Sequence, residues 1–157
     1  MDQQLIDRFA TAGERLRRGV EGLSPADIVA RPGPGAWSIL ECVVHIADMD
    51  AVAIDRMKRI IAEDNPPLLS ADEDRYAARL HYHEQSLDDA LTLIEVDRRQ
   101  FARVLRKLND ADFQRSGVHS VKGRVTVADI LDYFTHHADH HLDFILRKRI
   151  TLGKPLS

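Results

Sequence analysis

The chain contains four long segments in which apolar residues recur with the period of an α-helix. They span residues 2–22, 38–62, 86–108 and 126–150. The last three each open on a serine or threonine with an acidic residue three positions later, the pattern of a helix-capping box. No run of residues shows the sustained alternation of a β-strand. Four helices of about 20 residues predict an all-α fold, an up-down-type four-helix bundle.

The connections between these helices differ in length. Two prolines and two glycines make residues 31–36 a loop. Asn65-Pro66-Pro67 ends the second helix, and residues 63–85 form a connection to the third helix that is long enough for a lid or a crossover. Within this connection, residues 72–83 are expected to be irregular or weakly helical. Valines between positions 118 and 127 favour a short strand, although glycine and serine interrupt them, and we expect at most one minor hairpin in an otherwise helical fold.

Composition and charge exclude several classes of protein. The chain has 22 basic and 25 acidic residues, a net charge of −3, which is unfavourable for contacts with the phosphates of nucleic acids. No apolar run approaches the about 18 residues of a membrane span, and the first residues lack the features of a secretory signal. The single cysteine, Cys42, excludes an internal disulfide and suits the reducing cytoplasm. No repeat or change of composition divides the chain, so we expect one domain over residues 1–157.

The most unusual feature is a set of eight histidines, four of them between positions 136 and 141. They form two i,i+4 pairs, His136/His140 and His137/His141, and the members of each pair share a helix face. At about 100° per residue, His141 lies about 40° and His137 about 80° from the centre of the apolar face. His140 lies about 140° and His136 about 180° away from it. We therefore expect His137 and His141 to border the bundle interior and the other two to face water.

A buried histidine pair needs partners for its ring nitrogens, and one metal ion would satisfy both residues. Hydrogen-bonded core histidines are the alternative interpretation. A divalent ion takes a third or fourth protein ligand. The remaining candidates are His45, His81, His83, His119 and the carboxylates. Helical periodicity places His45 on the surface of the second helix, although a polar cleft between helices would also receive it. The residues alone do not choose the third ligand.

Three motifs resemble those of the DinB/YfiT-like superfamily. The first is Trp37-Ser38 with His45 seven residues after the serine, and the second is Phe-Thr-His-His-Ala-Asp-His-His-Leu-Asp-Phe-Ile near the C-terminus. The third is Ser116-Gly-Val-His-Ser-Val-Lys-Gly-Arg-Val-Thr-Val before the last helix. The resemblance implies a four-helix bundle with one divalent metal ion held by His45, His137 and His141. For His45 the resemblance carries the assignment alone.

The resemblance also implies a class of chemistry. Three histidine ligands leave a coordination position open, as in catalytic rather than structural sites. Zinc or nickel is favoured, and iron and manganese also suit imidazole ligands. Relatives include thiol-dependent S-transferases, a thiol-dependent isomerase and metal-dependent hydrolases. We expect a small-molecule substrate, with a low-molecular-weight thiol as one reactant, and a homodimer as the candidate assembly. A non-catalytic, stress-linked metal-binding bundle and an interaction bundle without metal are the alternatives.

Thiol activation is favoured over hydrolysis because no H-E-x-x-H glutamate accompanies the histidines. Metal coordination alone lowers the pKa of a thiol enough to form a thiolate at neutral pH, whereas the activation of water is helped by a general base. Asp139, between the two C-terminal ligands, is expected to point outward. Asp48 or Glu41 remain candidate bases for hydrolysis. The sequence assigns no catalytic residue.

Five further features carry a weaker functional prediction beside a structural one. Asp48 is a candidate acceptor for the His45 ring or else a surface carboxylate. His119 is interpreted as a loop cap rather than a residue of the site, and Trp37 as a packing anchor. Residues 72–76 are a substrate rim or, more simply, a solvated loop. Cys42 is expected to be an inert buried thiol.

Overall fold

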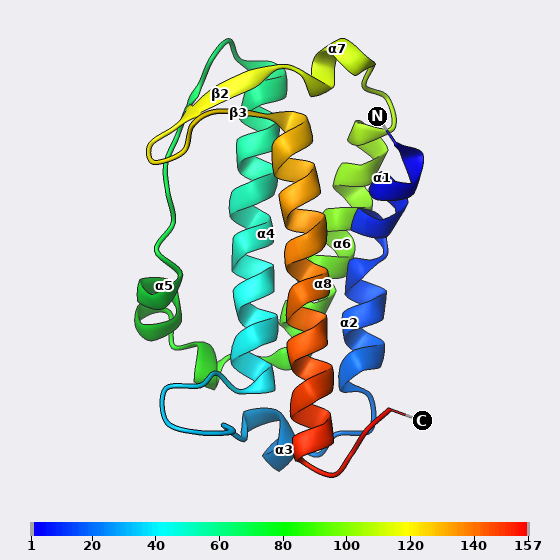
Figure 1. The fold of residues 1–157 in the computed structure, drawn as a ribbon, viewed down its shortest axis with the longest axis vertical. Coiled ribbons are helices and arrows are strands. Elements are labelled where there is room, and N and C mark those ends of the chain that lie inside the picture. Colours follow the sequence, from blue (N-terminus) through cyan, green and yellow to red (C-terminus); the bar gives the residue numbers. More distant parts are fainter. Residues whose placement is uncertain (1, 157) are drawn as a thin grey trace.

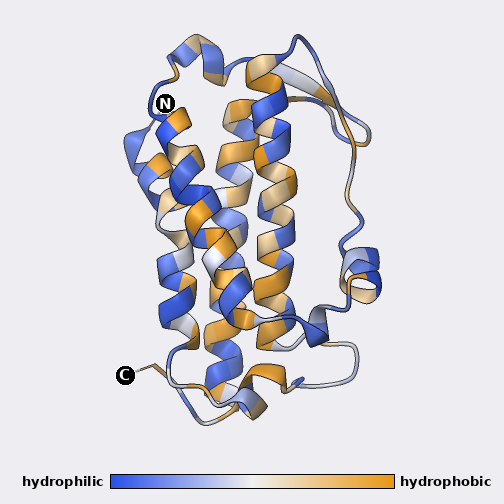
Figure 2. Cartoon of the chain, turned by 180° about the vertical axis from the view of Figure 1, so that it is seen from behind, coloured by the Kyte–Doolittle hydropathy of each residue, from blue (hydrophilic) through white to orange (hydrophobic). Residues whose placement is uncertain are grey.

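The computed structural model describes residues 2–156 and is dominated by four helical columns (Figure 1). Three columns are single helices: α4 (Ile39–Ala62), α6 (Leu87–Leu105) and α8 (Val127–Thr151). The fourth is formed by α1 (Gln3–Ala10) and α2 (Ala12–Val20). Figure 2 shows apolar and polar residues alternating along each long helix, as the helical period requires. The predicted all-α four-helix bundle is confirmed.

The first helix is interrupted, whereas the apolar spacing predicts one continuous helix over residues 2–22. Thr11 has φ −95° and ψ 4° and separates α1 from α2. Its Oγ1 donates to the carbonyl of Asp7 at 2.9 Å and accepts from Arg15 Nη1 at 2.9 Å. A threonine hydroxyl that bonds back to the preceding turn is a known cause of helix bending. Periodicity does not detect this break because the apolar face continues through it.

The other long helices begin where their capping residues predict. Ser38 and Thr126 form reciprocal capping boxes at the starts of α4 and α8, and Ser86 caps α6. The short helix α3 (Pro25–Val29) follows Ser24 in the same way. α6 ends at Leu105 instead of the predicted Leu108, because Asn109 caps a new short helix, α7 (Asp110–Phe113).

A small sheet at one end of the bundle contains the one minor hairpin that the sequence allows and, in addition, a short third strand (Figure 1). Its order is β1 (Pro67–Leu68), β2 (Ser116–His119) and β3 (Gly123–Thr126), with β1 parallel and β3 antiparallel to β2. Gly117, which interrupts the strand pattern in the sequence, is required in the structure. A Cβ at this position would lie 2.8 Å from the carbonyl oxygen of Pro66.

The long connection is a crossover, which runs outside the bundle from the sheet back to the opposite end (Figure 1). It includes β1, the helix α5 (Glu73–Arg79) and a single 3-10 turn at Tyr82–Glu84. Because of this crossover, α4 and α6 run in the same direction, so the up-down order predicted from the sequence is wrong for this pair. α5 contacts α4, so the polar residues of α5 lie beside the bundle.

The core consists of two apolar clusters separated by polar residues. One cluster includes Phe9, Met57 and Leu131, and the other includes Val43 and Ile145. Between them along the bundle, the buried Arg98 of α6 forms a bidentate ion pair with Asp50 of α4, at 2.5 and 2.6 Å. Within residues 2–156, no helix has the length and hydropathy that a membrane crossing requires.

Candidate metal centre

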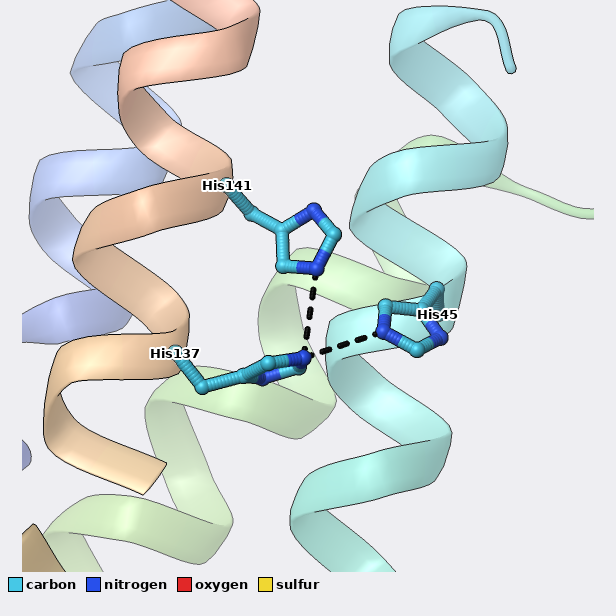
Figure 3. Close-up of side chains that lie close together, drawn as sticks. All are labelled: His45, His137 and His141. Carbon is cyan, nitrogen blue, oxygen red and sulfur yellow. Dashed lines mark hydrogen bonds between the residues drawn. The ribbon is translucent and has the colours of Figure 1, made fainter. Parts of the chain in front are cut away.

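Three histidine side chains meet between α4 and α8 (Figure 3). His137 and His141 lie one turn apart on α8 and point towards His45 on α4. The Nε2 atom of His137 is 3.1 Å from Nε2 of His45 and 3.2 Å from Nε2 of His141. One ring nitrogen from each residue lies within 4.8 Å of the others. The three acceptor nitrogens therefore converge on one point.

The face assignment of the C-terminal histidines agrees with the structure. His136 and His140 are exposed, whereas His137 and His141 are partly buried and face the bundle. The surface position that periodicity gives to His45 is wrong, because His45 is 0% exposed. α3, α5, α6, α8 and the 3-10 turn all contact α4, so its N-terminal half has almost no solvent face. Trp37 covers the His45 ring, with centroids 4.9 Å apart.

The three imidazoles are neutral at pH 7. Burial lowers the pKa of His45 to about 4. Burial, followed by the charges of the neighbouring histidines, lowers the pKa of His137 and of His141 to about 3. Neutral imidazole is the form that binds metal ions, so protons do not compete for these nitrogens near neutral pH.

The donor set fits a divalent ion. A neutral imidazole has one donor and one acceptor nitrogen, so His137 Nε2 cannot form good hydrogen bonds with both neighbours at once. Two nitrogens bound tetrahedrally at about 2.0–2.1 Å lie roughly 3.3 Å apart, close to the two separations found here. The Nδ1 atoms of all three rings are buried without a hydrogen-bond partner in residues 2–156. Each Nδ1 can carry the ring proton, which leaves each Nε2 lone pair for a metal ion.

The lowered pKa values predict a pH dependence of stability for the metal-free protein. As the pH falls through 6.5, the histidines of the unfolded chain bind protons, whereas the folded ones do not. The stability is therefore largest above pH 6.5 and falls until the pH reaches about 4 for His45 and about 3 for His137 and His141. At pH 5 we expect a loss of about 1–2 kcal/mol for each of His45, His137 and His141. Denaturant titrations at pH 7 and pH 5 measure this loss.

The replacement His137→Gln removes one histidine of the cluster and should reduce the difference in stability between pH 7 and pH 5. His136→Gln, which removes an exposed histidine of the same helix, should leave it unchanged. Equal differences in both variants would contradict the assigned pKa values.

Glu41 and Asp48, the carboxylates that the sequence offers as candidate bases, form no hydrogen bond with the three histidines in residues 2–156. Glu41 is 4% exposed, closes the capping box on Ser38 and is paired with Arg31, so it is not available as a base. Asp48 forms no hydrogen bond to His45, whose Nδ1 has no partner in the described residues. Asp48 instead adjoins Tyr82, and burial together with this carboxylate raises the pKa of the Tyr82 hydroxyl.

A carboxylate that the sequence does not single out lies at the site. Glu73, in the first turn of α5, has Oε2 at 3.8 Å from His45 Nε2, and its side chain is 63% exposed. It belongs to residues 72–76, for which the acidic run allows a substrate rim or a solvated loop. Its proximity depends on the path of the crossover, so the only signal in the sequence is the acidic run itself.

Two cavities flank the histidines. One, of about 250 Å³, is bordered by His137, Glu73 and His119, and the other, of about 520 Å³, is bordered by His141, Trp37 and Asp74. His119 also caps the β2–β3 turn, because its Nδ1 accepts from the backbone N–H groups of Val121 and Lys122 at 3.2 Å each. The loop-cap interpretation of His119 is therefore confirmed, and the residue lines a cavity as well.

The structure contradicts the sequence-based prediction for Asp139 and agrees with those for Cys42 and Trp37. Asp139 does not point outward: it lies between Arg8 and Arg15, each at 2.7 Å, and attaches α8 to α1 and α2. Cys42 is buried, as predicted, and burial raises the pKa of its thiol. Trp37 is a packing residue, also as predicted, but it packs on a candidate ligand.

A model of the DinB superfamily matches residues 8–145. The chain belongs to the DinB superfamily. Among solved structures, YfiT from Bacillus subtilis, a four-helix bundle of unusual topology, superposes with a TM-score of 0.91. The match covers 98% of this chain and 91% of YfiT at 21% identity. A second DinB-like protein of Bacillus subtilis gives a TM-score of 0.66 at 16% identity.

Curated DinB-type relatives carry the provisional name of metal-dependent hydrolase. One from Oceanobacillus iheyensis is 29% identical over 111 residues, which are 71% of this chain and 64% of that protein. The sequence of YfiT is 24% identical over 140 residues, 88% of this chain and 79% of YfiT. Together with the three-histidine cluster, these names support a metal-dependent function for this member of the superfamily.

Proposed function

We propose that this chain is a metal-dependent enzyme in which His45, His137 and His141 hold one divalent ion and Glu73 acts as a base beside it. The convergence of three neutral Nε2 atoms, 3.1 and 3.2 Å apart, is the observation that carries the proposal. A bound divalent ion would lower the pKa of a small nucleophile, water or a thiol, at its open position. Zinc or nickel remains the favoured ion.

Glu73 favours water as the nucleophile. The sequence favours a thiol because no H-E-x-x-H glutamate accompanies the histidines, and Glu73 supplies a carboxylate beside them from another part of the chain. Its carboxylate does not belong to the group of ligand atoms within 4.8 Å of one another, so it is proposed as a proton acceptor rather than a ligand. A general base needs to reach its proton directly or through one water, and 3.8 Å from a ligand nitrogen is compatible with that. The provisional names of the relatives agree with hydrolysis.

Thiol S-transfer is the second candidate. A transfer reaction needs room for a nucleophile and an acceptor, and the two cavities of about 250 and 520 Å³ lie on opposite sides of the histidine cluster. The larger cavity has aromatic and cationic walls, including Trp37, Phe144 and Arg147. A thiol of low molecular weight fits this space, and the smaller cavity would then receive the electrophile.

Replacement of Glu73 by glutamine should separate these chemistries. Glu73→Gln removes the proton acceptor and should lower kcat/KM for hydrolysis of a nitrophenyl ester by about 10²- to 10⁴-fold. The metal content should not change, because Glu73 is not a ligand. The assay uses the metal-loaded protein, with ester alone and with cysteine or glutathione plus monochlorobimane.

Glu84→Gln is the matched control, since Glu84 lies in the same connection with its side chain 68% exposed. It should leave both rates unchanged. Thiol conjugation that survives Glu73→Gln but is lost in His137→Ala would favour the S-transferase. Ester hydrolysis of equal rate in Glu73→Gln and Glu84→Gln would contradict the role of Glu73.

A further inference from the structure

The cavity beside His137 has an excess of one positive charge. Its wall includes Arg56 of α4 and Lys122 of the β2–β3 turn, and Glu73 is the only side-chain carboxylate among residues 2–156 that borders it. A second cavity of about 200 Å³ adjoins it and shares Arg56, Lys122 and Tyr133. Because the two cavities share these lining residues, which come from α4, α8 and the β2–β3 hairpin, we treat them together and call them the hairpin cleft.

Arg56 is held in the wall of the hairpin cleft with unused hydrogen-bonding capacity. One of its Nη atoms donates to the carbonyl of Leu69 in the crossover, which orients the guanidinium. Its Nε is buried and has no hydrogen-bond partner in residues 2–156. A buried donor without a partner is costly, and an oxygen ligand would satisfy it. A guanidinium also suits a carboxylate because its N–H groups match the two oxygens.

Lys122 and His119 add two donors on the hairpin side. The ammonium of Lys122 lies over the Tyr133 ring, 4.5 Å from its centroid, so it stays near the cleft. Because His119 Nδ1 accepts two backbone N–H groups, the ring proton resides on Nε2, where it can be donated. Burial, followed by the charges of Arg56 and Lys122, lowers the pKa of His119, which keeps the ring neutral at pH 7.

We propose that the hairpin cleft binds a carboxylate group of the substrate, with Arg56 and Lys122 as its charged partners. The inference rests on the proposed function, since it assigns a substrate class to the cavity that His137 and Glu73 border. The bound carboxylate would hold the rest of a small organic acid near the histidines. Arg56 and Lys122 would thus be binding and specificity residues of this site.

Charge and size favour a small monocarboxylate over a phosphate. The cavity beside His137 has two positive side chains against one negative, an excess of one positive charge. Asp129 borders only the adjoining cavity and keeps its negative charge while it accepts from the backbone N–H and hydroxyl of Thr126. It further reduces the positive charge of the whole hairpin cleft, which disfavours a doubly charged phosphate. A volume of about 250 Å³ admits a molecule of few heavy atoms, and Tyr133 and Phe134 offer aromatic walls for an apolar body.

Calorimetric titration of the metal-free protein tests the cleft without any contribution from a metal ion. Benzoate is the probe and benzamide its uncharged counterpart. We expect benzoate to bind at least about tenfold more tightly than benzamide, and Arg56→Gln to weaken benzoate by about tenfold or more. Arg59→Gln is the matched control: it removes the same charge one turn away, from an exposed arginine paired with Asp55, and should change nothing.

Three results would overturn the proposal: equal affinity for benzoate and benzamide, equal effects of Arg56→Gln and Arg59→Gln, or tighter binding of inorganic phosphate than of benzoate. Lys122→Gln, on an exposed turn where folding is not at risk, should weaken benzoate about threefold or more. An unchanged affinity in that variant would also contradict it. Zinc titration of the same samples reports separately on the metal centre, so either proposal can fail while the other stands.

Discussion

His137→Ala and His141→Ala should each abolish stoichiometric binding of a divalent ion. Removing residues that merely orient metal ligands typically costs 10- to 100-fold in affinity, so loss of a ligand itself should cost roughly 100-fold or more. His136→Ala and His140→Ala remove exposed histidines from the same two turns and should leave binding intact. Metal analysis of untagged protein after dialysis measures the stoichiometry and identifies the ion. Loss of metal in the second pair instead of the first would contradict the proposed ligands.

The same centre should stabilise the fold, since its ligands come from α4 and α8. An ion that binds only the folded protein adds about 2.7 kcal/mol at 100 times its dissociation constant. EDTA should therefore lower the melting temperature of the wild-type protein. His45→Ala should remove most of this sensitivity, because the bridge to α4 is lost. A full EDTA response in His45→Ala would mean that His45 does not bind the ion.

Asp50→Ala should destabilise the protein by about 3–5 kcal/mol, because it leaves Arg98 buried without its counter-ion. Both residues are almost fully buried, at 1% and 0% exposure, and are joined by two short hydrogen bonds. Arg98 also donates to the carbonyl of Phe134 on α8 and stacks over the ring of Phe9 on α1. The pair thus connects four helices beside the candidate metal centre. Urea denaturation of the metal-free protein measures the loss.

Two controls distinguish an unpaired buried charge from simple loss of packing. Asp55→Ala removes an exposed carboxylate from the same helix and should leave stability nearly unchanged. Replacing both partners together, Asp50→Leu with Arg98→Met, removes both charges, and such replacements often recover the stability that a single substitution loses. A double variant less stable than Asp50→Ala would mean that the ion pair makes a net favourable contribution to the free energy of unfolding.

The sequence by itself determined the features that depend on neighbours along the chain. Capping boxes act through hydrogen bonds across three residues, so the starts of α4 and α8 were predictable to the residue. The i,i+4 spacing and the helical angle likewise placed His137 and His141 inward and His136 and His140 outward. These interactions lie within one or two helical turns, and no tertiary contact overrides them. The family motifs agreed with the four-helix bundle and added the choice of His45.

Only the tertiary structure decided the features that depend on what packs against a helix. His45 lies on the polar side of α4 by periodicity, yet it is fully buried because the crossover and Trp37 cover that side. Glu73 reaches the histidines only because residues 63–85 return along the outside of the bundle. A glycine is required at position 117 of β2 because a Cβ there would lie too close to the carbonyl oxygen of Pro66. The burial of a side chain and its distance from a residue far along the chain arise from packing of whole elements, which local pattern and propensity do not specify.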